Sequence, residues 1–345
     1  MSNSIAILAA AGSRKTEHIV ESALATDGRV LIATYTNENR CQIVRRIEQK
    51  VGAMPPNITV MGWFSFLIAQ CAKPYQRALT KEPLLIRGLN FKGQRNRFTK
   101  KEEARRYFLD AQADFFRDAV SDFVVCLNNK TSGAVIGRLE RVFTHIFVDE
   151  VQDLAGYDLD VLELLIRSKI ALTVVGDPRQ CTLTTNTGAR HKKYRGAALA
   201  DWLSERADVC RLETRTESYR CNQALCDFAD AIFPAMPRTT SVGVPATDHD
   251  GVFEIKPAEV HAYVARYSPV DVLRHDRTVD TMGLPAVNIG IAKGSTLDRV
   301  LIFPTKPMLA YLKDRNPAKL KAPERLYVAV TRARFSVAFV VPPVR

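Results

Sequence analysis

Short apolar runs alternate along the chain with longer stretches in which apolar residues return every three or four positions. The first pattern predicts buried β-strands and the second predicts amphipathic helices, so their alternation predicts an α/β fold with parallel sheets. In the first part of the chain we expect strands at Ile5–Leu8, Arg29–Thr34, Ile58–Met61, Val142–Val148, Ile170–Val175 and Val209–Glu213.

A second set of elements follows the Pro-, Thr- and Gly-rich segment Pro234–Gly251, which predicts a loop or linker. This set is expected at Val252–Ile255, Val260–Tyr267, Val270–Arg274, Ala286–Ile291 and Val300–Phe303, before a helix at Pro323–Arg334 and a closing strand at Phe335–Val341. Because 345 residues exceed the size that a single core usually reaches, we expect two domains.

The apolar run at Val142–Val148 ends in two acidic residues, Asp149 and Glu150. Open α/β sheets bind their ligands beyond the carboxyl ends of the strands. Two adjacent carboxylates there suit phosphoryl transfer, in which one holds Mg²⁺ and the other orients a water molecule. Taken alone, the pair fits a solvated strand end equally well. A second polar cluster, which contains Gln180, follows the next strand and is expected at the same edge of the sheet.

The first strand is followed by the sequence A-A-A-G-S-R-K-T, which ends in Lys15 and Thr16, and then by an amphipathic helix. A phosphate-binding loop requires this order of strand, small-residue loop, Lys-Thr and helix. In such a loop backbone N–H groups hold phosphates, the Lys reaches the β/γ oxygens and the Thr hydroxyl reaches Mg²⁺. Ala9 and Arg14 replace the two defining glycines, while Gly12 is retained. Arg14 could either assist or crowd the phosphates.

Residues 75–141 interrupt the strand–helix rhythm with a strongly basic insertion in which Phe91 and Phe98 are interleaved. Cations mixed with aromatic rings are typical of a surface that binds single-stranded nucleic acid, and a solvated charged face is the alternative. The aromatic cluster after the third strand, Trp63, Phe64 and Phe66, could also stack on bases. Core packing of Trp63 and Phe66 is the alternative, and Phe64 is the ring expected to be exposed. The candidate contacts to nucleic acid are therefore Trp63, Phe64, Arg95, Arg97, Lys100 and Lys192.

The composition favours a polyanionic partner. Lys and Arg number 49 against 37 Asp and Glu, for a net charge of +12, and these positives are spread along the chain. Such a distribution favours nucleic acid over a membrane surface. The seven cysteines form no C-x-x-C pair, and no apolar run reaches membrane-spanning length. Because the first strand is predicted almost at the start of the sequence, we expect no signal peptide. We therefore expect a reduced, cytoplasmic protein without structural zinc.

Six motifs together resemble the UvrD/Rep-like superfamily 1 helicases in order and approximate spacing. They are A-A-A-G-S-R-K-T, V-D-E-V-Q-D, V-G-D-P-R-Q, E-S-Y-R-C-N-Q, A-K-G-S-T-L-D-R-V and R-L-Y-V-A-V-T-R-A. The resemblance implies two RecA-like P-loop NTPase domains with ATP between them, and a small, mostly helical, basic insertion in the first. The expected boundaries are 1–74 and 142–215 for the ATP-binding domain, 75–141 for a reduced 1B-like insertion, and 216–345 for the second domain.

The resemblance also implies roles for individual residues. Lys15 resembles the phosphate-binding lysine, Thr16 and Asp149 the Mg²⁺ ligands, and Glu150 the residue that activates the attacking water. Gln180 resembles a γ-phosphate sensor, Tyr219 the ring stacked on adenine, and Arg220 and Arg332 the two arginine fingers. The expected nucleotide contacts are Gly12, Ser13, Arg14, Lys15, Thr16, Tyr219 and Gly294.

The chain departs from the family pattern at several places. Few residues precede the phosphate loop, where the family has an adenine-reading glutamine, and Thr296 stands where a ribose-binding Glu is usual. The stretch between Arg220 and Ala292 is too short for the family's large 2B insertion, so the chain looks like a minimal core.

These departures leave two functions open. One is an ATP-dependent helicase or translocase stimulated by single-stranded DNA. The other is a regulatory or DNA-loading subunit, similar to the helicase component of Gabija-type antiphage systems, which would act beside a DNA nuclease of OLD/TOPRIM type.

Overall fold

The computed structural model describes residues 3–80, 84–93, 96 and 98–343. Contacts between residues divide the chain into two compact units. The first comprises Met1–Leu8, Thr16–Pro178 and Leu183–Glu213, and the second comprises Ala9–Lys15, Arg179–Thr182 and Thr214–Arg345. The loop that follows the first strand and the Arg179–Thr182 segment thus pack with the second unit.

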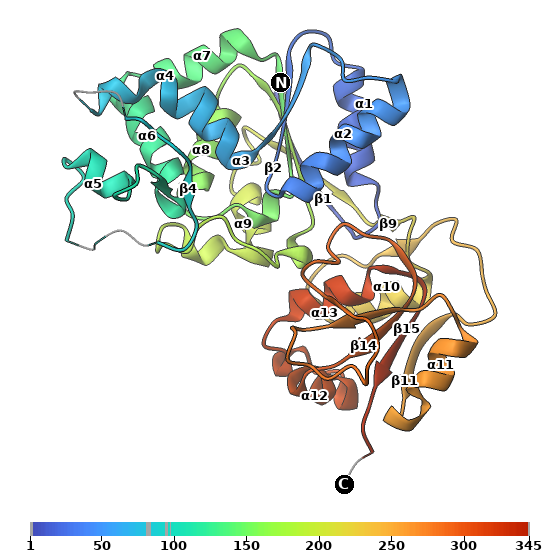
Figure 1. The fold of residues 1–345 in the computed structure, drawn as a ribbon. Helices are drawn as coiled ribbons and strands as arrows, with labels where there is room; N and C mark the ends of the chain where they lie inside the picture. The colour runs from blue at the N-terminus through green and yellow to red at the C-terminus, as the bar shows by residue number, and fades with distance from the viewer. Residues whose placement is uncertain (1–2, 81–83, 94–95, 97, 344–345) are drawn as a thin grey trace. The chain divides into compact units, whose positions relative to one another are not determined.

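A six-stranded sheet in the order β3-β2-β6-β7-β1-β8 forms the centre of the first unit (Figure 1). Its strands are β1 (Ser4–Ala9), β2 (Val30–Thr34), β3 (Ile58–Gly62), β6 (His145–Asp149), β7 (Ala171–Gly176) and β8 (Arg211–Arg215). The pairs β1/β7, β7/β6, β6/β2 and β2/β3 are parallel. Every residue of β2 is buried, as expected of a strand covered on both faces.

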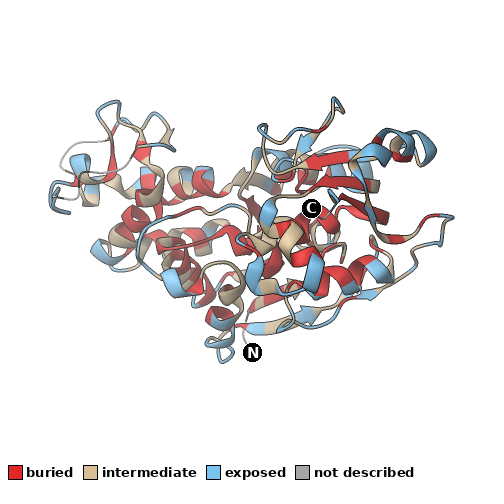
Figure 2. Ribbon diagram, turned by 90° about the horizontal axis from the view of Figure 1, so that it is seen from below, coloured by how far each residue is buried: buried red, intermediate tan, exposed pale blue. Residues whose placement is uncertain are grey.

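Helices lie on both faces of this sheet (Figure 1), and Figure 2 shows the strands and the inner surfaces of these helices as buried. The helices of the first unit, including those of the insertion, are α1 (Lys15–Leu24), α2 (Asn37–Val51), α3 (Trp63–Phe66), α4 (Lys73–Tyr75), α5 (Ala104–Phe108), α6 (Val120–Lys130), α7 (Ala134–Val142), α8 (Tyr157–Ile166) and α9 (Leu199–Ser204). A π-helical stretch, Leu67–Ala72, continues α3 into α4. In α2 the spacing of Ile43 and Ile47 places both on the buried face, and Thr36 caps the helix by accepting a hydrogen bond from Asn39 N (3.1 Å).

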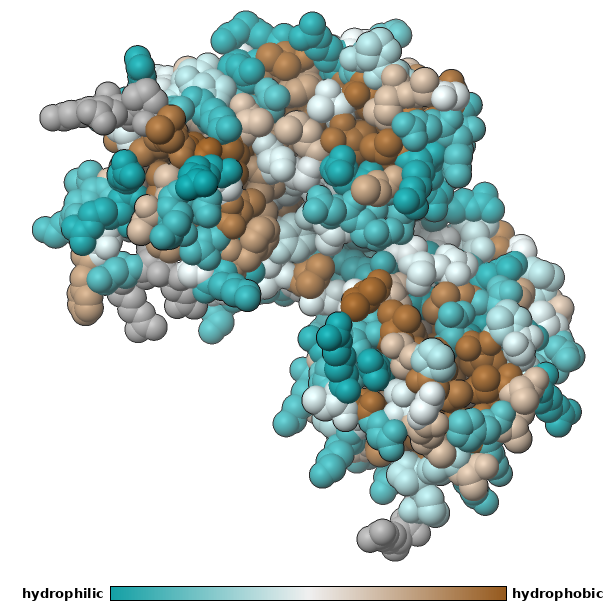
Figure 3. All heavy atoms as spheres, viewed as in Figure 1, coloured by the Kyte–Doolittle hydropathy of each residue, from teal (hydrophilic) through white to brown (hydrophobic). Residues whose placement is uncertain are grey.

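The insertion is helical for much of its described length and also carries a short parallel pair, β4 (Leu89–Asn90) and β5 (Phe115–Phe116). Helix α6 belongs to the core of the unit, because its residues Val120, Phe123 and Leu127 are fully buried. On the face drawn in Figure 3, hydrophobic and hydrophilic side chains mix at the end of the first unit that carries α4 and α5. The insertion is therefore anchored to the sheet by an apolar helix and exposes a mixed surface elsewhere.

The second unit contains a five-stranded parallel sheet in the order β11-β15-β14-β12-β13. Its strands are β11 (Gly251–Ile255), β12 (Asp271–Arg274), β13 (Val287–Asn288), β14 (Leu297–Phe303) and β15 (Ala333–Val340), and a separate pair joins β9 (Glu217–Ser218) to β10 (Thr240–Ser241). The helices are α10 (Gln223–Asp230), α11 (Val260–Arg266), α12 (Lys306–Asp314) and α13 (Pro323–Val330).

The fold class expected from the sequence is confirmed: both units are α/β with parallel sheets. One expected helix limit is wrong: the helix expected at Pro323–Arg334 ends at Val330, because β15 begins at Ala333. Helix α10 begins at Gln223, because Ser218 pairs in β9 and the Asn222 side chain caps the helix by accepting from Leu225 N (3.1 Å). None of the helices in the described part of the chain is long and apolar enough to cross a membrane.

His145, at the start of β6, makes the stability of the first unit depend on pH. Its ring stacks on Phe147 at 3.9 Å, its Nε2 lies 2.9 Å from Thr173 Oγ1, and burial lowers its pKa from 6.5 to about 4. As the pH falls from about 6.5 toward 4, the unfolded chain takes up a proton that the folded protein does not bind, so stability is lost in this window.

We therefore expect the free energy of unfolding, measured by urea titration, to fall more steeply between pH 6.5 and pH 4 in the wild type than in His145→Gln. The two should follow parallel pH dependences above pH 7. Parallel dependences across the whole range would mean that His145 titrates alike in the folded and unfolded chain.

Candidate active site

The loop between β1 and α1 folds around its own lysine. Lys15 Nζ donates hydrogen bonds to the carbonyl oxygens of Ala9 (3.0 Å) and Ala10 (2.9 Å). Gly12 has φ +79°, and a Cβ there would lie 2.6 Å from Ser218 Oγ and 2.7 Å from Arg220 Cβ. A side chain at position 12 would therefore meet both left-handed backbone strain and a close approach of the chain. Gly12 is required at the position where the motif retains it.

Arg14, which replaces a motif glycine, turns its side chain onto Tyr219. Its guanidinium carbon lies 4.2 Å from the centre of the Tyr219 ring, and its backbone has φ +58°. The Tyr219 hydroxyl donates to Glu217 Oε2 (2.8 Å), and this hydrogen bond raises the pKa of the phenol. Tyr219 N also donates to Gly12 O (3.0 Å). The ring expected to stack on adenine is thus held beside the loop with an arginine on one face.

Within the first unit, the expected Mg²⁺ ligands meet. The Thr16 hydroxyl donates to Asp149 Oδ2 (3.3 Å), and Asp149 is buried at the end of β6. A hydroxyl and a carboxylate oxygen at this spacing fit Mg²⁺, which keeps waters and phosphate oxygens as its remaining ligands. Within the described residues, no group of three or more His, Cys, Asp or Glu side chains could hold a metal ion.

Ser13 adds a polar atom to the loop. Its Oγ is buried and has no hydrogen-bond partner among the described residues. A buried hydroxyl without a partner carries a free-energy cost that an incoming oxygen ligand would remove. This atom therefore fits a loop that receives phosphate oxygens.

Glu150 adopts a left-handed backbone, with φ +57°, immediately after β6. The Gln152 side chain bridges it to the next strand end: its Nε2 donates to Glu150 Oε2, and its Oε1 accepts from Asp177 N (3.1 Å). Gln152 is itself buried. Sequence reasoning did not single out Gln152, although its place in V-D-E-V-Q-D, two residues after the acidic pair, could have drawn attention to it.

In the second unit, Gln180 and Arg332 are in direct contact. Arg332 is 2% exposed and donates to Gln180 Oε1 (2.9 Å), Val328 O (3.3 Å) and Ser295 O (3.4 Å). Arg220 donates to Thr331 O (3.0 Å), one residue before Arg332. The structure therefore gathers the two expected arginine fingers and the expected γ-phosphate sensor in one unit.

Arg179 and Tyr327, which sequence reasoning missed, connect α10, α13 and the loop after β1. Arg179 forms a buried ion pair with Asp230 (3.1 Å), and its guanidinium carbon lies 4.9 Å from the Tyr327 ring centre. The Tyr327 hydroxyl accepts from Ala11 N in the phosphate loop (3.4 Å). The signal in the sequence was an arginine directly before Gln180, but its acidic partner is distant in the chain. Gly294, the remaining expected nucleotide contact, has φ +95° in the loop before β14.

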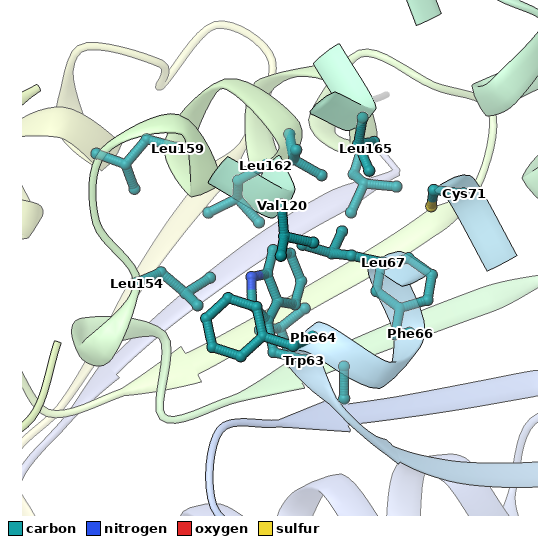
Figure 4. Close-up of a cluster of buried hydrophobic side chains, with 14 of the residues drawn as sticks. Trp63, Phe64, Phe66, Leu67, Cys71, Val120, Leu154, Leu159, Leu162 and Leu165 are labelled. Carbon is teal, nitrogen blue, oxygen red and sulfur yellow. The ribbon is translucent and has the colours of Figure 1, made fainter. Parts of the chain in front are cut away.

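The expectation that Phe64 is exposed is wrong. Phe64 is 6% exposed and Trp63 is 1% exposed, and Figure 4 shows both rings in the hydrophobic core beside Val120 and Leu154. Trp63 Nε1 donates to the buried Asp158 Oδ1 (2.7 Å). Neither ring is available for base stacking in this structure, because the insertion covers the start of α3.

The other candidate contacts to nucleic acid are basic. Lys100 and Lys192 are exposed. Arg95 and Arg97 lie outside the described residues. The roles of all four stay predictions.

Comparisons with known proteins agree with this architecture. Residues 64–184 match the family model described as the UvrD/REP helicase N-terminal domain. The fold is similar to the crystal structure of arterivirus nonstructural protein 10, a helicase, at 16% sequence identity and a TM-score of 0.51, covering 98% of this chain and 59% of that chain. The structure of the same arterivirus helicase in complex with DNA also matches, at 16% identity and a TM-score of 0.51, covering 98% of this chain and 61% of that one.

The chain thus spans about three fifths of the length of these helicases, and at 16% identity they show the fold alone. No curated protein matches the chain in sequence. The resemblance to UvrD/Rep-like superfamily 1 helicases is confirmed by the family match and the shared fold.

Gly176, the last residue of β7, leaves the space that Gln152 occupies. A Cβ at this position would lie 2.3 Å from Gln152 Oε1 and 2.9 Å from Val151 Cγ1. We expect Gly176→Ala to lower the free energy of unfolding by about 1–3 kcal/mol, the usual cost of overpacking a core, as measured by urea titration.

Gly137→Ala in α7 is the matched control. Its added Cβ has no neighbour closer than 3.8 Å, so alanine's helix propensity should leave stability unchanged or higher. A Gly176→Ala protein as stable as the control would show that Gln152 and Val151 yield without cost.

Proposed function

From the UvrD-like, superfamily 1 character of the chain, we propose that it hydrolyses ATP in response to single-stranded DNA and uses the hydrolysis to move along that strand. The observation that supports this most directly is the hydrogen bond between Thr16 and Asp149 at the end of β6. Gln152, three residues after Asp149, bridges Glu150 to Asp177. This arrangement would give a cation site and an oriented carboxylate at one strand end. Hydrolysis of a phosphoanhydride requires both.

Each residue has a distinct part in the proposed reaction. Lys15, released from the carbonyls of Ala9 and Ala10, places its charge on the β/γ-phosphate oxygens. Thr16 and Asp149 would hold Mg²⁺, which would neutralise phosphate charge. Glu150 accepts a proton from the attacking water, and Gln152 keeps its carboxylate in position.

The arginines would stabilise the negative charge that develops in the transition state. Arg332 is buried, so its charge acts in a medium of lower dielectric than water. Gln180 holds its guanidinium at 2.9 Å and would transmit the presence of a γ-phosphate to it. In related NTPases such an arginine is worth roughly 10³–10⁵ in turnover.

The DNA part of the proposal has two supports. The net charge of +12 favours a polyanion. One of the similar helicase structures is a complex with DNA. A DNA nuclease partner and a role in antiphage defence stay predictions from the sequence, because no observation on the described residues bears on them.

The first test removes the phosphate-binding charge and the proposed base. Lys15→Ala should abolish ATP hydrolysis, measured as phosphate release. Glu150→Gln should retain binding of a fluorescent ATP analogue while turnover stops, because an amide cannot accept the proton of the water. Lys50→Ala, which removes a lysine paired with Glu17 on the surface of α2, is the control and should hydrolyse ATP normally. Near-normal turnover in Glu150→Gln would reject the assignment of β6 as the catalytic strand.

The second test separates catalysis from binding at Arg332. Arg332→Ala should lower turnover by orders of magnitude and change nucleotide affinity far less, because the arginine acts on charge that exists only in the transition state. Arg334→Ala, two residues away and paired with Asp298 at 3.0 Å, is the matched control.

Because Arg332 is buried, its replacement could also disturb the fold. Arg332→Lys, which keeps the positive charge, and a thermal unfolding scan of each variant distinguish loss of chemistry from loss of fold. A fall in affinity alone, with turnover at saturation intact, would make Arg332 a structural cation.

A further inference from the structure

The ring of Phe91, in the insertion of the first unit, is exposed although its surroundings are built to hold it. Phe91 follows β4 directly and is 57% exposed, whereas the aromatic rings packed beneath this part of the insertion are buried. An exposed phenylalanine on a mobile loop would need no explanation. Phe91 lies instead on a turn that side-chain hydrogen bonds fix.

Asn90 makes that turn. Its Oδ1 accepts from Lys92 N (3.1 Å) and Gly93 N (2.6 Å), and its Nδ2 donates to Asp110 Oδ2 (2.7 Å). A Cβ at position 93 would lie 2.3 Å from Asn90 Nδ2, so only glycine fits there without a shift. The backbone on both sides of Phe91 is therefore fixed before any ligand binds.

The turn is also anchored to the hydrophobic core. Leu89 pairs with Phe115 in the β4/β5 ladder, and Phe115 is fully buried against Phe123, with ring centres 5.2 Å apart. Because Phe91 directly follows β4, this ladder ties its backbone to the core of the first unit.

Phe64 supports the Phe91 ring from below. The two ring centres are 6.2 Å apart at an interplanar angle of 78°, and Phe64 in turn packs on Tyr35 at 6.0 Å and 71°. Both contacts have the edge-to-face geometry that aromatic pairs prefer. The buried Phe64 thus orients a neighbour that keeps more than half of its surface exposed.

The stretch of sequence that contains Phe91 is strongly basic. Eight Lys or Arg stand against two Glu between residues 85 and 106. Lys101 and Arg106 are paired with Asp122 and Glu103, whereas Arg87 and Lys92 are exposed and make no ion pair within the described residues. A ligand that suits this surface carries negative charge and a flat apolar face. Single-stranded nucleic acid has both, because its bases are unpaired and its phosphates are regularly spaced.

We propose that Phe91 is a base-stacking platform for single-stranded nucleic acid, with Arg87 and Lys92 contacting the adjacent phosphates. The proposal deepens the proposed function and rests on its strand-binding part. It moves the stacking role from Phe64, where the sequence suggested it, to the exposed ring that Phe64 supports.

The test compares two fluorescent probes of equal length: an oligothymidylate and the same backbone with every base removed. Phe91→Leu keeps an apolar side chain over Phe64 but has no aromatic face. It should weaken oligothymidylate binding roughly 5- to 150-fold, the range found for loss of one stacked base, and leave binding of the abasic probe unchanged. Phe91→Tyr should retain wild-type affinity.

Two further variants isolate the charge and the apolar surface. Lys92→Ala should weaken both probes equally and lower the slope of log affinity against log salt by about 0.7, the value for one phosphate contact on a single strand. Leu85→Ala removes another exposed apolar side chain of the insertion, 82% exposed, and should bind both probes as the wild type does.

Several outcomes overturn the platform. Unchanged binding of both probes by Phe91→Leu would mean that the ring does not contact the strand and binds another partner, such as a protein. Equal loss of both probes would indicate a disturbed insertion. A wild type that binds neither probe would reject the strand-binding part of the proposed function itself. A wild type that prefers oligothymidylate to the abasic probe, with the same preference in Phe91→Leu, would reject the platform alone.

Discussion

The register of three neighbouring parallel strands determines where chemistry can occur in this protein. In β6, β7 and β1, Asp149 lies opposite Val175, and Leu8 lies opposite Gly176. Because the strands are parallel and almost wholly buried, their side chains form the core, and the first polar groups appear where all three end. The acidic pair, the bridging glutamine and the start of the phosphate loop follow from that alignment.

The strand end after β6 carries backbone strain that its hydrogen bonds offset. A non-glycine residue in the left-handed region, as Glu150 is, costs of order 1–3 kcal/mol. A hydrogen bond to a charged group returns about 1.5–3 kcal/mol, and Gln152 donates one to the Glu150 carboxylate. Gly176 makes room for Gln152. The carboxylate that we propose as the catalytic base is therefore positioned by a glutamine and a glycine that have no chemistry of their own.

The sequence predicted the strands, the turn from β1 into α1 and the acidic end of β6, because each depends on local patterns of a few residues. It could not predict contacts between distant segments. Phe64 shows why: apolar periodicity places it after a strand, but whether it is covered depends on the insertion, whose Phe91 and Val120 pack near it. The Arg179–Asp230 pair was missed for the same reason, since its partners are 51 residues apart.

Arg14 shows how a local sequence motif and a contact with a distant segment together determine the position of one side chain. The sequence left open whether this cation assists or crowds the phosphates, because a motif alone does not say where a long side chain turns. In the structure, its positive φ costs of order 1–3 kcal/mol, the same range as at Glu150. Its stacking on Tyr219 contributes about 0.5–1 kcal/mol. Because this contact is weak, Arg14 can leave the ring at little cost, and under the proposed function a base that stacks on Tyr219 would compete with a weak contact rather than with a fixed one.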